Sequence, residues 1–305
     1  MDKSSTCLLC GKTGVIRDSH VVPSFVFRWL RDTSPGQLRT NTTPNRRVQD
    51  GPKRNWLCDE CEQRLSRWEN EFALKVFNPL HENPAPSIGV KYGPWALKFA
   101  TSISWRTILF YRDCPSPHLT ALDRQSLEGA EKVWRRFMLD QIANLGRFTQ
   151  HVIVVDAPLI GSGPAVSPFI ARYLTRTVQS DIITSSSMCF VYTKLGRVIV
   201  IGFIRVNEPK SWVGTLLKAS NGTLGGAVTY KVPNTLINYW NQKANQAASI
   251  FGKMSSRQRE KINDLFRKVD PEILSQTDVF RAIKADVGIS GQDAFNVTRG
   301  KRTKS

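Results

Sequence analysis

The chain of 305 residues is long enough for one large domain or for two to three smaller ones. Its hydrophobic content of 41% and charged content of 22% are ordinary for a globular protein, and its most apolar run, 198–206, contains Arg205 and is too short to span a bilayer, which excludes a membrane helix there. Lysine and arginine outnumber aspartate and glutamate by 43 to 25, giving a net charge of +18 that favours a polyanion such as nucleic acid as the partner.

The first residues and the cysteines predict the compartment. No apolar stretch typical of a signal peptide precedes Cys7, so we expect a cytoplasmic protein without a membrane partner. In a reducing compartment, cysteines are more often metal ligands or buried thiols than disulfides. Cys114 and Cys189 stand alone in the sequence and are predicted to be buried or partly buried thiols.

The other four cysteines form two Cys-x-x-Cys pairs, Cys7 with Cys10 and Cys58 with Cys61. A spacer of two residues lets one tight turn present two thiolates to one ion, and Zn²⁺ prefers four soft ligands at tetrahedral corners. Two such pairs near the start of one chain therefore predict a structural Zn²⁺ site.

The segment between the cysteine pairs is rich in turn-forming and basic residues. The stretches 33–36 and 41–45 are typical of turns. Arg46, Arg47, Lys53 and Arg54 are predicted to contact the phosphates of a nucleic acid. Arginines also alternate with aromatic residues at 27–31 and 134–137, and for the second stretch we favour an amphipathic helix whose arginines face water.

The segment after Cys58 has a helical pattern. Leu65, Trp68, Phe72 and Val76 recur at spacings of three and four residues and form one apolar face. Pro79 and the run 83–86 are predicted to end this helix. The first region of the protein would then cover residues 1–80.

Later elements alternate between helical and strand patterns, which favours an α+β fold. A mostly helical stretch is predicted over 95–145, a strand over 151–155, a hairpin over 189–204 with Gly196 in its turn, and a helix from Thr235. These elements divide into an α+β region, 90–234, and a helical region, 235–305, that ends in a basic tail. The apolar stripes of the two helical stretches are Leu127, Ala130, Trp134, Phe137 and Gln141, and Ile237, Trp240, Ala244, Ala247 and Phe251.

The first quarter of the chain resembles the HNH, or His-Me finger, endonucleases. The residues that carry the resemblance are the first cysteine pair, the run Arg17-Asp-Ser-His-Val-Val-Pro23, Asn55, and the second cysteine pair at the start of a helix. The resemblance implies a small zinc-stapled, treble-clef-like ββα module that holds one catalytic divalent metal, Mg²⁺ or Mn²⁺.

The resemblance also implies a role for each matched residue. His20 lies where the family places its general base, and a neutral imidazole can accept a proton from water near neutral pH. Asn55 resembles the asparagine that orients this histidine or the hairpin. Glu62 lies at the helix position of a metal ligand, and its oxygen suits Mg²⁺ or Mn²⁺.

One departure from the family concerns the residue before His20. The family has an aspartate or glutamate ligand there, whereas this chain has Ser19, whose hydroxyl is a poorer ligand for a hard cation. Asp18 could replace that carboxylate only if the strand is irregular, because on a regular strand it shares the face of His20. Glu69 is a second acid on the face of Glu62, but about 10.5 Å further along the helix. Either Glu62 is the only charged ligand, or Asp18 is recruited, or the site is inactive.

These observations favour a metal-dependent endonuclease that acts on nucleic acid, with DNA as the preferred substrate and bacterial or phage defence as the setting. The alternatives are a catalytically inactive zinc module that binds nucleic acid, and a module that binds an acidic protein. The C-terminal region is a candidate for contacts with a protein partner or for homo-oligomer formation.

Overall fold

The computed structural model describes residues 4–34, 38–40, 44–82, 89–113, 119–155, 166–226 and 228–295. The chain forms two compact units, each assembled from three separate segments. Unit 1 comprises Met1–Ser24, Gly51–Val154 and Val178–Lys231, and unit 2 comprises Phe25–Asp50, Val155–Thr177 and Val232–Ser305. These units cut across the regions 1–80, 90–234 and 235–305 that the sequence suggests, because segments distant in sequence pack together in each unit.

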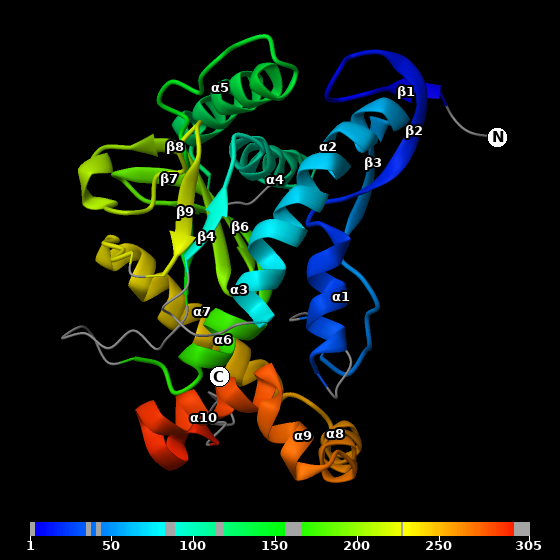
Figure 1. Ribbon diagram of the computed structural model, residues 1–305, viewed down its shortest axis with the longest axis vertical. Helices are drawn as coiled ribbons and strands as arrows, with labels where there is room; N and C mark the ends of the chain where they lie inside the picture. The colour runs from blue at the N-terminus through cyan, green and yellow to red at the C-terminus, as the bar shows by residue number, and fades with distance from the viewer. Residues whose placement is uncertain are drawn as a thin grey trace, which may run out of the picture. The chain divides into compact units, whose positions relative to one another are not determined.

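Unit 1 begins with an antiparallel sheet of three strands followed by a helix. The strands are β1 (Ser4–Thr6), β2 (Thr13–His20) and β3 (Lys53–Cys58), in the order β1-β2-β3, and the helix is α2 (Asp59–Phe72). Figure 1 shows α2 beside β2 and β3, against which it packs. The two strands and the helix are therefore arranged as ββα.

The helix that begins after Cys58 does not end at Pro79, so that expectation is wrong. A π-helical turn, η1 (Ala73–Phe77), follows α2, and α3 (Asn78–Glu82) contains the proline. Proline lacks an N–H and its ring clashes with the carbonyl one α-helical turn earlier. The N–H of Asn78 donates to the Ala73 carbonyl five residues back, and this wider turn carries the chain past Pro79. Residues 83–86 lie outside the described residues.

A four-stranded antiparallel sheet and two helices form the larger part of unit 1. The strands are β5 (Gln150–Val154), β6 (Val178–Thr184), β7 (Met188–Leu195) and β8 (Val198–Val206), in the order β5-β8-β7-β6. Helix α4 (Trp95–Asp113) packs on β7 and β8, and α5 (Ala121–Met138) packs on α4. A Cβ atom at Gly202 would lie 2.7 Å from Ser104 Oγ, so only glycine allows this close approach of sheet and helix. Strands β4 (Gly89–Tyr92) and β9 (Gly222–Gly225) form a separate pair, and η2 (Pro209–Ser211) is a 3₁₀ turn.

Unit 2 is helical in its described part. Its elements are α1 (Ser24–Asp32), α6 (Ile170–Arg176), α7 (Asn234–Gly252), α8 (Ser256–Lys268), α9 (Pro271–Gln276), α10 (Asp278–Ser290) and the 3₁₀ turn η3 (Gly291–Ala294). The buried carboxylate of Asp286 accepts hydrogen bonds from the backbone N–H groups of Ala171 (2.7 Å) and Arg172 (3.2 Å). It thereby satisfies N–H groups that have no partner inside α6 and fixes α10 to that helix.

The mixed α+β fold class is confirmed, and so are several local patterns. The stripe of α5 is buried at Leu127, Ala130, Trp134 and Phe137, whereas Gln141 lies beyond the end of the helix and is exposed. Gly196 has a positive φ of 63° in the turn between β7 and β8, as the hairpin pattern predicts. On α7 Trp240 and Ala244 are buried as predicted, whereas the buried Leu236 and Ala248 each lie one position from the predicted Ile237 and Ala247. The side chain of Phe251, the last residue of the predicted stripe, lies outside the described residues. Among the described residues, no helix has the length and the apolar character needed to cross a membrane.

Candidate functional site

The four paired cysteines converge on one point in unit 1. The sulfur atoms of Cys7, Cys10, Cys58 and Cys61 all lie within 4.8 Å of one another, and those of Cys10 and Cys58 are 3.8 Å apart. Four thiolates at the usual 2.3 Å from a tetrahedral Zn²⁺ would be separated by about 3.8 Å. The donor set and its spacing therefore fit a metal such as zinc.

Two local structures bring the cysteine pairs together. Cys7 and Cys10 lie in a turn that Gly11, with a φ of 79°, closes by donating its N–H to the Cys7 carbonyl over 2.9 Å. Cys58 ends β3 and is the N-cap residue of α2, whose first turn contains Cys61. The N–H of Leu8 donates to the Trp56 carbonyl over 2.9 Å, and this bond fixes the turn to β3.

Helix α5 also contacts the turn that contains the first cysteine pair. Arg135 Nε donates to the Leu9 carbonyl over 2.6 Å, between the two ligands of the turn. The expectation that both arginines of 134–137 face water is therefore wrong for Arg135, although Arg136 is exposed and Trp134 and Phe137 are buried.

The thiols differ in how readily they lose a proton. Burial raises the pKa of the Cys7 thiol, but backbone N–H groups of Cys10, Cys58 and Leu9 lower it more, to about 7. Burial raises the pKa of Cys58 and of Cys61, and the negative charge of Cys7 raises that of Cys61 further. A cation at the centre of the cluster would offset this repulsion and favour the four thiolates together.

The other two cysteines lie outside this cluster. Cys189 is buried in β7, as the sequence predicts, and burial raises the pKa of its thiol to about 12. Cys114 lies outside the described residues.

Four of the predicted site residues share one face of the β2–β3 pair. Asp18 pairs with Asn55 and His20 pairs with Lys53 across the two strands. Directly paired residues of antiparallel strands point to the same side, and so do alternate residues of one strand. The Asp18 carboxylate lies 4.0 Å from the Lys53 amine and is 63% exposed. This face is therefore open to solvent.

Asp18 could leave the face of His20 only if the strand were irregular between these two residues. The observed irregularity lies before Asp18. The register shifts between Arg17 and Asp18, where Trp56 of β3 has no partner on β2. Trp56 and Leu57 are consequently both buried, and the Trp56 Nε1–H donates to Asp113 of α4 over 3.2 Å. From Asp18 to His20 the pairing is regular, which leaves Asp18 on the face of His20.

The opposite face of β2 meets α2 at the position of the proposed divalent site. Ser19 is 1% exposed, and its hydroxyl donates a hydrogen bond to Glu62 Oε1. Arg54 pairs with Ser19 and so lies on this inner face, where its guanidinium is 5.0 Å from the ring centre of Phe110. The chain therefore brings Ser19 to Glu62, while His20, the next residue, pairs with Lys53 on the other side.

A buried arginine of α4 connects both parts of this site. Arg106 is 3% exposed, and its guanidinium donates to the backbone carbonyl of His20 over 2.9 Å and lies 2.7 Å from Glu69 Oε1. Glu69, the second acid on the face of Glu62, is thus an ion-pair partner in this structure. Helix α4 is itself attached to the four-stranded sheet, because Ser104 Oγ donates to Gln150 over 2.8 Å.

Sequence reasoning did not single out Arg106, although the sequence contains a signal for it. From Phe99 to Leu109 every residue of α4 is buried, and Arg106 is the only charged residue among them. A lone charge in such a stretch needs a buried partner of opposite charge.

The four predicted phosphate-contacting residues are divided between the units. Lys53 and Arg54 belong to unit 1 and lie on opposite faces of β3. Arg46 and Arg47 belong to unit 2 and are both exposed.

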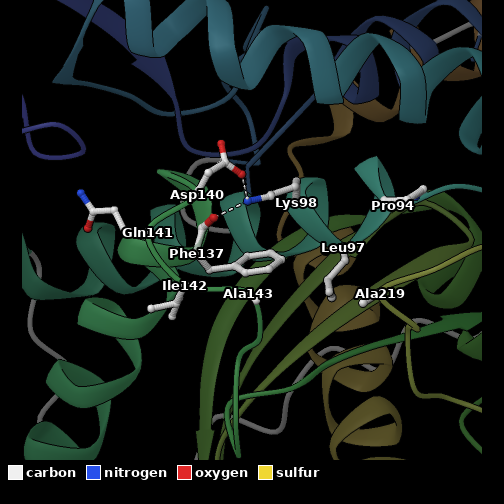
Figure 2. A pocket seen from close by; sticks show the side chains of 9 residues that line it. All are labelled: Pro94, Leu97, Lys98, Phe137, Asp140, Gln141, Ile142, Ala143 and Ala219. Carbon is white, nitrogen blue, oxygen red and sulfur yellow. Dashed lines mark hydrogen bonds and ion pairs between the residues drawn. The ribbon is translucent and has the colours of Figure 1, made fainter.

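Unit 1 also contains a shallow groove of about 380 Å³, drawn in Figure 2. Lys98 lines the groove. Its amine lies 2.7 Å from the Asp140 carboxylate and 4.0 Å from the ring centre of Phe137. The hydrogen bond from Lys98 lowers the pKa of Asp140. The two charges are thus paired with each other, and none of the predicted site residues lines the groove.

Comparison of the chain with protein-family models, with curated proteins and with solved structures gives no significant match.

Proposed function

We propose that the start of unit 1 is a zinc-stapled, treble-clef-like ββα module that hydrolyses phosphodiester bonds of nucleic acid, with DNA as the preferred substrate. The observation that carries this proposal is the contact between Ser19 of β2 and Glu62 of α2, beside the cysteine cluster and one residue before His20. It occurs between the strand and the helix positions that hold the metal in the HNH family.

In this proposal Zn²⁺ on the four cysteines fixes the helix to the strands, and Glu62 holds a second cation, Mg²⁺ or Mn²⁺. Carboxylate and hydroxyl oxygens are ligands that such cations accept, and Ser19 would be the neutral one. A divalent cation there would supply positive charge to the oxygens of the scissile phosphate. Arg54, held over Phe110 on the same face, would bind a further phosphate oxygen.

His20 would act as the general base. Because Ser19 and His20 face opposite sides of β2, this role requires the phosphate to lie across the end of the strand, where the His20 side chain can turn toward the position of Ser19 and Glu62. The imidazole would take a proton from the attacking water as the new P–O bond forms and the bond to the leaving oxygen breaks. The Arg106 contact to the His20 carbonyl would hold the backbone of that residue in place.

A second candidate is a zinc module that binds nucleic acid without cleaving it. One observation favours it: the buried Ser19 hydroxyl already occupies an oxygen of Glu62, so that carboxylate has a neutral partner in place of a metal. In this alternative the cysteine cluster keeps its structural role and His20 has no catalytic one.

Nicking of supercoiled plasmid by the full chain, with Mg²⁺ or Mn²⁺, tests the two candidates. A nuclease should nick, and His20→Ala should lower the rate about 10²- to 10⁴-fold while zinc content and DNA affinity stay unchanged. Thr13→Ala, an exposed change at the other end of β2, is the matched control and should nick like wild type. Equal nicking by His20→Ala would disprove the base assignment, and a wild type that binds DNA but never nicks it would support the second candidate.

A further inference from the structure

Two basic segments of unit 2 that are distant in sequence meet in the structure. Arg39 donates to the side chain of Gln258 over 3.0 Å, across 219 residues of sequence. The Asn45 side chain accepts a hydrogen bond from the N–H of Ser255 over 2.9 Å. Arg39 and Asn45 are therefore both attached to the start of α8.

Positive charges within the first segment lie close to one another. Arg39 and Arg47 pair with each other in an isolated β-bridge. Arg46, the residue before Arg47, is exposed, and so is Arg47. Burial and the charge of Arg47 both lower the pKa of Arg39. Among the described residues, no carboxylate forms an ion pair with Arg39, Arg46 or Arg47. An external anion would relieve this repulsion.

Helix α8 adds exposed cations to the positive charges of Arg39, Arg46 and Arg47. No residue of α8 is buried, and Arg257, Lys261 and Lys268 are exposed at positions i, i+4 and i+11, which lie on one side of a helix. The stripe is about 16 Å long at 1.5 Å per residue. On the helix surface it adjoins Gln258, the residue that holds Arg39.

We propose that these six residues, which we call the basic ridge, form a binding surface for the phosphate backbone of duplex DNA. The members of the ridge are Arg39, Arg46, Arg47, Arg257, Lys261 and Lys268. This inference rests on the proposed function, in which nucleic acid is the substrate, and adds a contact surface in unit 2.

The chemistry of the ridge fits a phosphate backbone better than a protein surface. Duplex DNA presents one negative charge per about 1.7 Å of its axis, so a stripe of about 16 Å faces several phosphates at once. Interfaces between proteins are enriched in aromatic residues and depleted in lysine at their centres. The large apolar side chain that α8 exposes is Leu265, and the carboxylate of Asp264, which lies within the stripe, forms an ion pair with Arg267 over 3.4 Å.

The ridge can be tested with the full chain, a fluorescent duplex and a series of salt concentrations. The variant Arg257→Gln/Lys261→Gln/Lys268→Gln should weaken binding at low salt at least tenfold, and should lower the magnitude of the salt slope by about 2 to 3 if each cation contacts one phosphate. Arg46→Gln/Arg47→Gln should lower it by about 2. Lys91→Gln/Lys210→Gln/Lys218→Gln removes the same charge from exposed sites of unit 1 and should leave the slope unchanged.

The ridge is disproved if its triple variant keeps the wild-type slope, or if the unit 1 control changes the slope equally. Tighter binding of poly-glutamate than of the duplex would also overturn it, in favour of an acidic protein partner. Arg257→Lys/Lys261→Arg/Lys268→Arg keeps the charge and should restore the slope, which separates charge from folding. A chain that binds DNA through the ridge but never nicks it would disprove only the nuclease, whereas a chain that nicks DNA while its ridge variants keep the wild-type salt slope would disprove only the ridge.

Discussion

Ser19 of β2 donates its hydroxyl to the carboxylate of Glu62 in α2, across 43 residues of sequence. In the proposed HNH-like site, this contact would leave one carboxylate and one neutral oxygen in place of two charged ligands. Because hard cations bind carboxylates much better than hydroxyls, the affinity of the proposed site for a divalent cation would depend on Glu62. A single substitution at Ser19 can therefore place a second carboxylate next to Glu62.

Ser19→Asp should make the stability of the protein depend on divalent metal. Without Mg²⁺ or Mn²⁺, two carboxylates in a buried position repel each other, so the free energy of unfolding should fall below that of wild type. With Mn²⁺ at 100 times its Kd, binding should return about 2.7 kcal/mol. Thermal unfolding across a Mn²⁺ series measures this, with Ser19→Asn as the uncharged control. An unfolding temperature of Ser19→Asp that ignores Mn²⁺ would show that no cation binds here.

Cys58→Ser should abolish zinc binding and unfold the β2–β3–α2 module. Structural zinc sites contribute about 10–16 kcal/mol of apparent binding free energy, which the remaining contacts of so small a module cannot replace. Metal analysis of the wild type should give one zinc per chain, and hydrogen exchange in β2 and β3 should rise sharply in the variant. Cys189→Ser, at a buried cysteine outside the cluster, is the control and should keep its zinc. A folded wild type without zinc contradicts the assignment.

Breaking the Arg106–Glu69 ion pair should loosen the end of β2. Glu69→Gln leaves a buried guanidinium without its counter-charge, which costs about 3–5 kcal/mol. Arg106→Lys keeps the positive charge but lacks the planar guanidinium that contacts both the His20 carbonyl and Glu69. Hydrogen exchange over residues 18–22 should therefore increase. If the chain nicks DNA, its kcat should fall about 100-fold with little change in KM.

The control for this pair is Arg205→Lys, which alters another ion pair of unit 1, formed with the buried Asp123. It should lower stability without raising exchange at 18–22. Equal effects of Arg106→Lys and Arg205→Lys on exchange and on kcat would reduce Arg106 to a general structural role.

Acid should destabilise the protein through His151. Burial lowers the pKa of this imidazole to about 3, and Thr149 and Thr215 contact its two ring nitrogens at 3.0 and 2.8 Å. Below the unfolded pKa of about 6.5 the unfolded chain therefore binds more protons than the folded one. The free energy of unfolding should fall by about 1.4 kcal/mol for each pH unit down from there. Urea unfolding between pH 7.5 and 5 measures this slope, and His151→Gln should reduce it by that amount. An unchanged slope in His151→Gln would assign the acid sensitivity to other groups.

Sequence patterns predicted those features that depend on neighbouring residues. The Cys-x-x-Cys pairs, the stripe of α5 and the turn at Gly196 are set within one or two turns of chain, and the structure contains them. The side of the strand on which Asp18 lies depends on the unpaired Trp56, which belongs to a different strand. The partner of Arg106 is likewise fixed by a contact between separate helices, which no local periodicity contains.

The interleaved units have a consequence for the order in which this protein can fold during synthesis. Residues 25–50 lie between the two cysteine pairs, yet they belong to unit 2, and Arg39 reaches its partner Gln258 only 219 residues later. At about 5–20 residues per second, a ribosome needs roughly 10 to 45 s to make that partner. The cysteine cluster, complete at residue 61, can close within that interval. Zinc would then hold the segment 25–50 as a loop with both ends fixed while its own packing partners are still being made.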